Sequence, residues 1–459
     1  MPAPCLKGAE AASIAGWLTL LLVTGVGIRV LLWSVYEPIH HSDTSSYFSV
    51  ARAISTGDFS DYQGRRTPGY PILLILAGLD PATVWLYQMA AGLLVSALLF
   101  YLTLQLTNRA WWAALVGMTY NLNLAQLFYE ANLISETMTT LAVTVTVSLL
   151  FLVSGQLYRG ARVLRGLGAL GLAAGWAVLT RPQFAFVPVL VGGLVGLSTF
   201  SMGRCAKRGI RRACVAGLPG VLLMLGWSSF NYSQVGYFAL STFQGFNLTN
   251  HSVAWIETAP ERYATVRDVL LKYREEKVAR TGRHSMAVFE ALPELQEATG
   301  LSMPALSKEL QEMSIAIFLR NPLRYGLAVM GAWTDFWLAP NYWRLERLRP
   351  PSLARPLERA WNVEKWVLRF LNAAFLALVG VLILSGSVHL QSKKGLQMVS
   401  VVAVVLFSSW IQALTEYGEN PRYGITVQPL VVLFVLNMVH AYWKGEGKPA
   451  KQAESPSSK

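Results

Sequence analysis

Long apolar runs recur along most of this sequence, and short polar loops separate them. Each run covers about 17–25 residues, which is enough for a helix to cross a hydrocarbon layer roughly 30 Å thick. Hydrophobic residues make up 53% of the chain and charged residues only 14%, so the apolar surface exceeds what one soluble core buries. The runs lie near 12–35, 84–105, 110–128, 133–153, 166–180, 183–201, 213–232, 366–388, 396–414 and 424–443.

These runs predict an all-α polytopic membrane protein with about 10–11 transmembrane helices. Two further apolar stretches fit less well. The stretch 71–79 is too short to span, and we expect it to dip into the outer leaflet or pack on the bundle. The stretch 322–339 would break the alternation of loop charges if it crossed the membrane, so we expect a re-entrant or interfacial helix there, with an eleventh span as the alternative.

The basic residues indicate the orientation. The formal net charge is +13, but Lys and Arg collect in short loops between apolar runs, which is typical of cytoplasmic loops rather than of a nucleic-acid-binding face. These loops lie around 159–165, 204–212 and 393–394 and in the C-terminal tail. We therefore expect both termini in the cytoplasm, an uncleaved first helix, and 36–83 and 233–365 outside.

This topology suggests four parts. The first is an N-terminal membrane module, 1–235, whose outer loop 36–83 carries the candidate active site. An extracytoplasmic segment, 236–365, follows, with short amphipathic helices expected near 261–280 and 304–320. C-terminal membrane helices then occupy 366–443, and a polar tail, 444–459, is expected to be disordered. Cys5, Cys205 and Cys214 lack paired or metal-ligand spacing, so neither a disulfide nor a structural zinc is expected.

The outer loop begins HHSDTSSYFSVARAISTGDF. If Thr44 to Ser55 is helical, one face gathers the apolar positions Tyr47, Val50, Ala51 and Ile54, and the helix lies along the membrane surface. Asp43 then stands at its N-terminus, either as a cap that accepts backbone N–H groups or as a catalytic carboxylate. The two interpretations are compatible, because a capped carboxylate is held rigid and ionised.

Three arginines stand beside prolines at apolar boundaries, namely Arg66 in RRTPGYP, Arg181 in TRPQF and Arg422 in NPRYG. Each could be an ordinary side chain that reaches water from a helix end. All three fall on the predicted outer side, however, and a guanidinium group matches phosphate oxygens. Together they indicate an anionic lipid headgroup or a pyrophosphate-like ligand.

Glu136, in YEANLISETMTT, is expected at the outer end of a span, where a carboxylate is costly unless it is paired or hydrated. It is therefore a second functional candidate, although an ordinary helix start would also explain the local sequence. His40 and His41 are adjacent and should diverge, so metal ligation is not expected.

In order and sidedness these motifs resemble the GT-C glycosyltransferases, in particular the branch of protein mannosyltransferases and the aminoarabinose transferase of lipid A (glycosyltransferase family 39-like). The resemblance covers nearly the whole chain and implies a location in a prokaryotic cytoplasmic (inner) membrane. The segments that carry it are HSDTSSYFSVARAISTGDF, RTPGYPILL, YNLNLAQLFYEANLISETM, TRPQFAFVPVL, NYSQVGYFALSTFQGFNLTNHS, FLRNPLRYGL and NPRYGITVQPLVVL.

The resemblance implies roles for particular residues. Asp43 matches the outer-loop aspartate of the family, Glu136 its second carboxylate, and Arg65 or Arg66 its phosphate-contacting basic residue. Arg422 and Tyr423 match its terminal Arg-Tyr pair. Many relatives carry Asp-Glu where this chain has Asp43-Thr44, which leaves a metal-assisted site in doubt. We add Arg181 to the donor phosphate site and predict a sugar or acceptor pocket at His41, Tyr47, Tyr70 and Asn247.

The resemblance further implies an inverting hexosyl- or pentosyltransferase that moves a sugar from a polyprenyl-phosphate donor to an extracytoplasmic glycan, lipid or protein. It implies no cofactor, although a divalent metal is compatible with it, and no nucleic-acid partner. The sequence has no Gly-rich phosphate loop in a strand-to-helix context, which argues against a nucleotide-sugar donor. The alternatives are a transporter or flippase for a lipid-linked sugar, an oligosaccharide ligase or polymerase that uses a diphosphate-linked donor, and a non-catalytic assembly partner.

Overall fold

The computed structural model describes residues 8–159, 163–386 and 390–444. Within these ranges the chain is built from helices, and its only strand-like pairing is a parallel bridge between Ile39 and Asn132. Cys5 and the tail 445–459 lie outside the described residues, whereas Cys205 and Cys214 are free and exposed.

The helices of the bundle follow the apolar runs closely. Seven helical segments of the described chain are long and apolar enough to cross a membrane, and two further apolar helices, α8 and α20, are shorter. The bundle helices are α1 (Gly8–Val35), α4 (Pro81–Thr107), α5 (Ala110–Asn121), α7 (Glu136–Tyr158), α8 (Leu164–Thr180), α9 (Val187–Ser201), α10 (Ala206–Val235), α17 (Ala354–Leu384), α18 (Lys393–Thr415) and α20 (Gln428–Trp443). The prediction of an all-α polytopic membrane protein is confirmed.

Two predicted spans are interrupted. The run 110–128 divides into α5 and a short helix α6 (Leu124–Ala131), because the Asn123 side chain accepts a hydrogen bond from the Gln126 N–H at 2.9 Å and starts a new helix. The last run divides into α19 (Asn420–Gly424) and α20. Both interruptions supply backbone and side chains to the candidate site.

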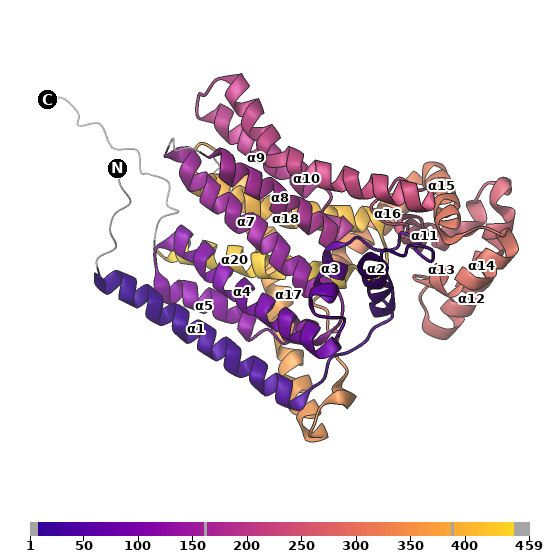
Figure 1. The fold of residues 1–459 in the computed structure, drawn as a ribbon, viewed down its shortest axis with the longest axis horizontal. Coiled ribbons are helices and arrows are strands. Elements are labelled where there is room, and N and C mark those ends of the chain that lie inside the picture. Colours follow the sequence, from indigo (N-terminus) through magenta and orange to yellow (C-terminus); the bar gives the residue numbers. More distant parts are fainter. Residues whose placement is uncertain (1–7, 160–162, 387–389, 445–459) are drawn as a thin grey trace.

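Short helices gather at the end of the bundle opposite the start of α1 and the end of α20 (Figure 1). The first long loop provides α2 (Thr44–Thr56) and α3 (Gly69–Leu76). The apolar face of α2 is as predicted, since Tyr47, Val50 and Ala51 are buried and Ile54 is partly buried.

The second long segment provides α11 (Gln244–Ser252), α12 (Ala264–Thr281), α13 (Ala287–Glu290), α14 (Leu292–Thr299) and α15 (Met303–Arg320). Phe246, Leu270, Leu295 and Leu310 are fully buried in an apolar cluster that α11 to α15 share. The amphipathic helices expected near 261–280 and 304–320 correspond to α12 and α15.

The stretch expected to be re-entrant or interfacial forms α16 (Pro322–Phe336), which is not among the helices long enough to span. Trp333 Nε1 donates to Ser409 Oγ of α18 at 3.1 Å, and Asn372 Nδ2 of α17 donates to the carbonyl oxygen of Trp337 at 2.7 Å. Leu323 and Leu327 on the same helix are 84% and 74% exposed, so one apolar face is left open to lipid.

A buried ion pair ties the first helix to the rest of the bundle. Arg29 of α1 donates two hydrogen bonds to Glu130 of α6, at 2.8 and 2.5 Å, and a third to Asn121 Oδ1 at 2.9 Å. Gln88 of α4 donates to the carbonyl oxygens of Glu130 and Asn132. An unpaired charge at this depth would be costly, so the network fixes where α6 ends and the turn before α7 begins.

The loops with clustered basic residues lie at one end of the bundle. The start of α1, the end of α20, the end of α7 with the start of α8, and the turn from α9 to α10 all lie at the end of the bundle opposite α2, α3 and α11–α15 (Figure 1). The bundle therefore separates the two sets of segments that the charge pattern assigned to opposite sides. Which set faces the cytoplasm stays a prediction from the loop charges.

Native and introduced cysteines can test this sidedness. Ser60 and Cys205 are both exposed and belong to opposite sets of segments. In a background with Cys5→Ser and Cys214→Ser, we expect Ser60→Cys to react with a membrane-impermeant maleimide on intact cells. Cys205 should react only after the cells are opened. The reverse pattern would contradict the orientation and with it the extracytoplasmic site.

Candidate functional site

The first outer loop is attached to the turn that precedes α7. The Ile39 N–H donates to the carbonyl oxygen of Ala131 at 2.9 Å, and the Leu133 N–H donates to that of Ile39 at 3.0 Å. Thr44 Oγ1 donates to the Leu133 carbonyl oxygen at 3.0 Å. These bonds place the start of α2 beside the start of α7, and so bring Asp43 close to Glu136.

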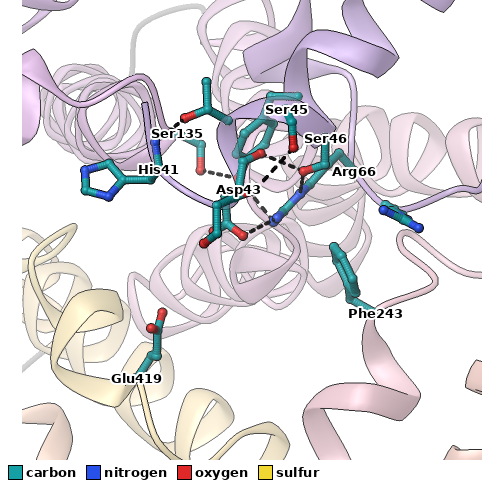
Figure 2. A network of polar contacts seen from close by, with 12 residues as sticks. His41, Asp43, Ser45, Ser46, Arg66, Ser135, Phe243 and Glu419 are labelled. Carbon is teal, nitrogen blue, oxygen red and sulfur yellow. Dashed lines mark hydrogen bonds and ion pairs between the residues drawn. The ribbon is translucent and has the colours of Figure 1, made fainter. Parts of the chain in front are cut away.

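Asp43 precedes α2 but does not act as its cap. Its side chain makes no capping hydrogen bond, because both carboxylate oxygens accept from arginines instead. Arg66 Nη2 lies 2.6 Å from Oδ1 and Arg422 Nη2 lies 2.8 Å from Oδ2 (Figure 2 shows the first of these pairs). The expectation of a capping role is therefore wrong at this position, and long-range ion pairs hold the carboxylate.

Arg422 joins three carboxylates from different parts of the chain. Its Nη2 pairs with Asp43, its Nε with Glu136, and its Nη1 with Glu419 Oε2 at 3.0 Å. Glu136 is almost fully buried, whereas the side chains of Asp43 and Glu419 are 26% and 30% exposed. In Figure 2 the Glu419 carboxylate points toward that of Asp43. The three carboxylates surround one guanidinium group at the edge of solvent.

Two further arginines flank this group. Arg66 Nε donates to Ser46 Oγ at 2.8 Å, and its guanidinium lies over the rings of Tyr47 and Phe243, at 4.5 and 4.8 Å from their centroids. Arg181 Nη1 lies 3.0 Å from Glu136 Oε1, and its guanidinium lies 4.2 Å from the ring centroid of Tyr423. The arginines predicted from three separate motifs thus converge on one site.

Arg65 lies next to this group but is not paired with a carboxylate among the described residues. Its Nε donates to Met303 Sδ at 2.8 Å, which is a weak acceptor. Partial burial lowers the pKa of Arg65, and the positive charge of Arg66 lowers it further. Arg65 is therefore a partly buried cation without a carboxylate partner among the described residues.

The predicted sugar or acceptor residues divide into two groups. His41 and Tyr47 lie at the site, where the His41 ring contacts that of Tyr342 with centroids 4.5 Å apart and the Tyr47 hydroxyl bonds Ser135 Oγ at 2.9 Å. Tyr70 is fully buried and donates to Gln88 Oε1, so it supports Tyr47 from behind. Within the described chain, no side-chain hydrogen bond or ion pair links Asn247 to the cluster.

The sequence interpretation missed Glu419 and Tyr342. Tyr342 follows α16, and Arg422 lies 5.2 Å from its ring centroid. A signal for Glu419 was present, because a carboxylate three residues before an arginine on a short helix lies on the same face. Nothing in the local sequence marks Tyr342, since only the return of the chain after α16 brings it here.

The charges in this cluster do not balance. Arg65, Arg66, Arg181 and Arg422 are four cations, and Asp43, Glu136 and Glu419 are three anions, which leaves one positive charge. Burial by itself would raise the pKa of Asp43, but Arg66 and Arg422 hold it well below its usual range. Burial raises the pKa of Glu416, just after α18, to about 7, and the nearby charge of Glu419 raises it too. The four arginines thus exceed the carboxylates by one charge when Glu416 is protonated and match them when Glu416 is ionised.

The acidic residues of the site do not form a recognisable metal centre. Across the described residues, no group of three or more His, Cys, Asp and Glu side chains could hold a metal ion. In this structure the cation that lies between Asp43, Glu136 and Glu419 is the guanidinium of Arg422.

Comparison with solved structures finds the archaeal oligosaccharyltransferase AglB from Archaeoglobus fulgidus, in complex with an inhibitory peptide and a dolichol-phosphate. It is 12% identical, with 97% of this chain and 53% of that chain covered and a TM-score of 0.49. ArnT from Cupriavidus metallidurans in the apo state is 14% identical, with 87% and 77% covered and a TM-score of 0.36. This chain spans about half the length of the oligosaccharyltransferase.

No family model matches the sequence, and no curated protein matches it. At these identities and scores, the function rests on the chemistry of the site itself.

The ion pairs of Asp43 predict a pH-dependent stability. A carboxylate with a depressed pKa stabilises the fold fully above its ordinary value of 3.8 and loses that contribution as the pH falls toward its folded value. Asp43→Asn should therefore lower the free energy of unfolding by about 1–3 kcal/mol at neutral pH. The difference should shrink below about pH 4, as measured by thermal unfolding in detergent.

Asp61→Asn provides the matched control, because Asp61 is exposed in the same loop. It should have almost no effect at any pH. A constant deficit of Asp43→Asn from pH 7 to pH 3 would show that charge pairing is not what Asp43 contributes.

Proposed function

We propose that this chain is a membrane glycosyltransferase that moves a sugar from a polyprenyl-phosphate donor to an extracytoplasmic glycan, lipid or protein. One observation carries the proposal: Asp43, Arg66 and Arg422, from three distant motifs, meet at a single solvent-edged site at the predicted outer end of the bundle. This arrangement offers both cations for a phosphate and a carboxylate for an acceptor or sugar hydroxyl.

The proposal assigns Arg65 and Arg422 to the donor phosphate. Arg65 has no carboxylate partner among the described residues, whereas Arg66 and Arg422 are already paired. A phosphate that reaches Arg422 has to replace one of its carboxylates, and Glu419 is the most exposed of the three. Cations placed here would stabilise the negative charge that develops on the leaving phosphate.

The polyprenyl tail needs only an apolar surface close to this site. The lipid-facing side of α16 offers one, since Leu323 and Leu327 are exposed there and Arg422 follows α18, against which α16 packs. The activated donor supplies the energy of transfer, and the proposal requires no cofactor.

The environment of Asp43 shapes its role. A carboxylate with a strongly depressed pKa is a weak general base, because proton transfer is most efficient when the pKa lies near the working pH. A phosphate that draws Arg66 or Arg422 away would weaken this effect and make Asp43 more basic. Asp43 therefore orients hydroxyl groups before the donor binds and can accept a proton afterwards. The inverting outcome would follow from direct attack of the acceptor on the sugar.

Two other functions make different demands on the structure. A flippase would be expected to place its functional charges near the bilayer midplane, but the cluster described above lies at one end of the bundle. The buried Arg29–Glu130 pair lies among the bundle helices but is fully hydrogen-bonded within the protein. A ligase or polymerase with a diphosphate-linked donor would use the same cations, and donor identification separates it from the proposed reaction.

The catalytic role of Asp43 can be tested by activity. Asp43→Asn should reduce sugar transfer at least about 10²-fold, because an amide keeps the shape but neither carries charge nor accepts a proton. The measurement is transfer from a synthetic short-chain polyprenyl-phosphate sugar, with Asp61→Asn as control. Transfer near the wild-type rate by a folded Asp43→Asn variant would exclude this role and move attention to Glu136.

The donor site predicts that Arg65→Ala raises the KM for the donor about tenfold or more while the KM for the acceptor changes little. Because Arg65 has no carboxylate partner among the described residues, this variant should keep wild-type stability. Arg422→Ala, in contrast, would leave Glu419 without its arginine and Asp43 and Glu136 with one arginine each. Arg66→Lys should retain only part of the activity, since a lysine lacks the planar fork. Unchanged donor kinetics in Arg65→Ala would refute the phosphate site.

Glu419→Gln gives the opposite expectation. If the Glu419 carboxylate competes with the donor phosphate for Arg422, its neutralisation should lower the donor KM by about threefold to tenfold. Competition assays with a polyprenyl phosphate measure the same change as tighter inhibitor binding. Weaker binding of this phosphate would show instead that Glu419 holds Arg422 in the binding geometry.

A further inference from the structure

A second group of basic residues lies where α9 turns into α10, at the end of the bundle opposite the candidate site. It consists of Arg204, Lys207, Arg208, Arg211 and Arg212. Arg204, Arg208 and Arg211 all lie close enough to Arg212 to act on its charge. Within the parts of the chain that the structure describes, none of the five pairs with a carboxylate. Such concentrated like charge is unfavourable unless an anion neutralises it.

Arg212 gives this cluster the character of a built site. Arg212 is only 8% exposed, yet its Nη1 has no hydrogen-bond partner among the described residues. A buried guanidinium that lacks a partner for one of its N–H groups is costly. Arg204 is held beside it by a hydrogen bond of 3.1 Å from its Nη2 to the carbonyl oxygen of Leu157 at the end of α7.

The backbone adds to the positive field. Helix α10 begins here, is 30 residues long, and has Cys205 at its N-cap position without a side-chain cap bond. The first N–H groups of a helix carry partial positive charge and point out of its N-terminus. The cluster therefore combines guanidinium groups with free backbone donors, which suits phosphate oxygens.

The surroundings indicate where the phosphate comes from. Ile210 and Leu218 on α10 are 57% and 51% exposed, and Leu197 on the adjoining α9 is 56% exposed. These apolar side chains face the hydrocarbon of the membrane that the fold requires, so acyl chains can lie beside the arginines. A soluble anion would gain nothing from this apolar surface.

We propose that the α9–α10 turn is a binding site for an anionic phospholipid of the leaflet opposite the candidate active site, with Arg212 and Arg204 on its phosphate. Arg208, Arg211 and Lys207 would attract the same headgroup from the surface. This lipid site is independent of the proposed glycosyltransferase activity and of the residues around Asp43.

The test uses the full chain in lipid nanodiscs and in detergent. Native mass spectrometry should show that the protein retains phosphatidylglycerol in preference to phosphatidylcholine. Arg212→Gln, and separately the exposed pair Arg208→Gln with Arg211→Gln, should each weaken this retention about fivefold or more. Arg212→Lys should retain only part of it, since a lysine keeps the charge but lacks the planar fork. Arg283→Gln, an exposed arginine of the opposite set of segments, should behave as wild type.

Two outcomes would overturn the proposal. The first is equal retention of both lipids by wild type, or wild-type retention by both glutamine variants. The second is protection by inorganic phosphate or glycerol phosphate alone that matches the thermal stabilisation given by phosphatidylglycerol, since that would show a soluble anion site. Because Arg208 and Arg211 are exposed, their variant keeps the test decisive even if Arg212→Gln does not fold.

Discussion

The guanidinium of Arg422 connects three segments of the chain at the end of the bundle that carries α2, α3 and α11–α15. It pairs with Asp43 from the first outer loop, Glu136 from the start of α7 and Glu419 from its own short helix. A charge this deep is tolerated only when its partners satisfy every donor, so the three segments have to meet at this point.

A second constraint fixes the frame around this group. The Arg29–Glu130 pair anchors α6 to α1, and Gln88 holds the backbone of the turn that follows. The bridge between Ile39 and Asn132 then attaches the first outer loop to that turn. Rigid membrane helices therefore position the loop residues at the site, which favours preorganised charge over a flexible lid.

The two arginine clusters differ in a way that bears on their roles. At the outer site, three of four arginines are paired with carboxylates, so a ligand has to exchange with Glu419 or use Arg65. At the α9–α10 turn, no such carboxylate is present among the described residues, and Arg212 is buried with an unused donor. The first arrangement suits a transient substrate, whereas the second suits a lipid that stays bound.

The sequence by itself determined the membrane class, the long apolar helices, the helix after Asp43 and most of the charged residues that meet at the site. Apolar length and the requirement to satisfy backbone groups in hydrocarbon decide those features locally. Only the tertiary structure decided that Asp43 pairs with arginines instead of capping α2, that Tyr70 packs behind the site, and that Glu419 and Tyr342 belong to it. Those features depend on contacts between segments hundreds of residues apart, such as Asp43 with Arg422, and no local pattern encodes which buried charges meet.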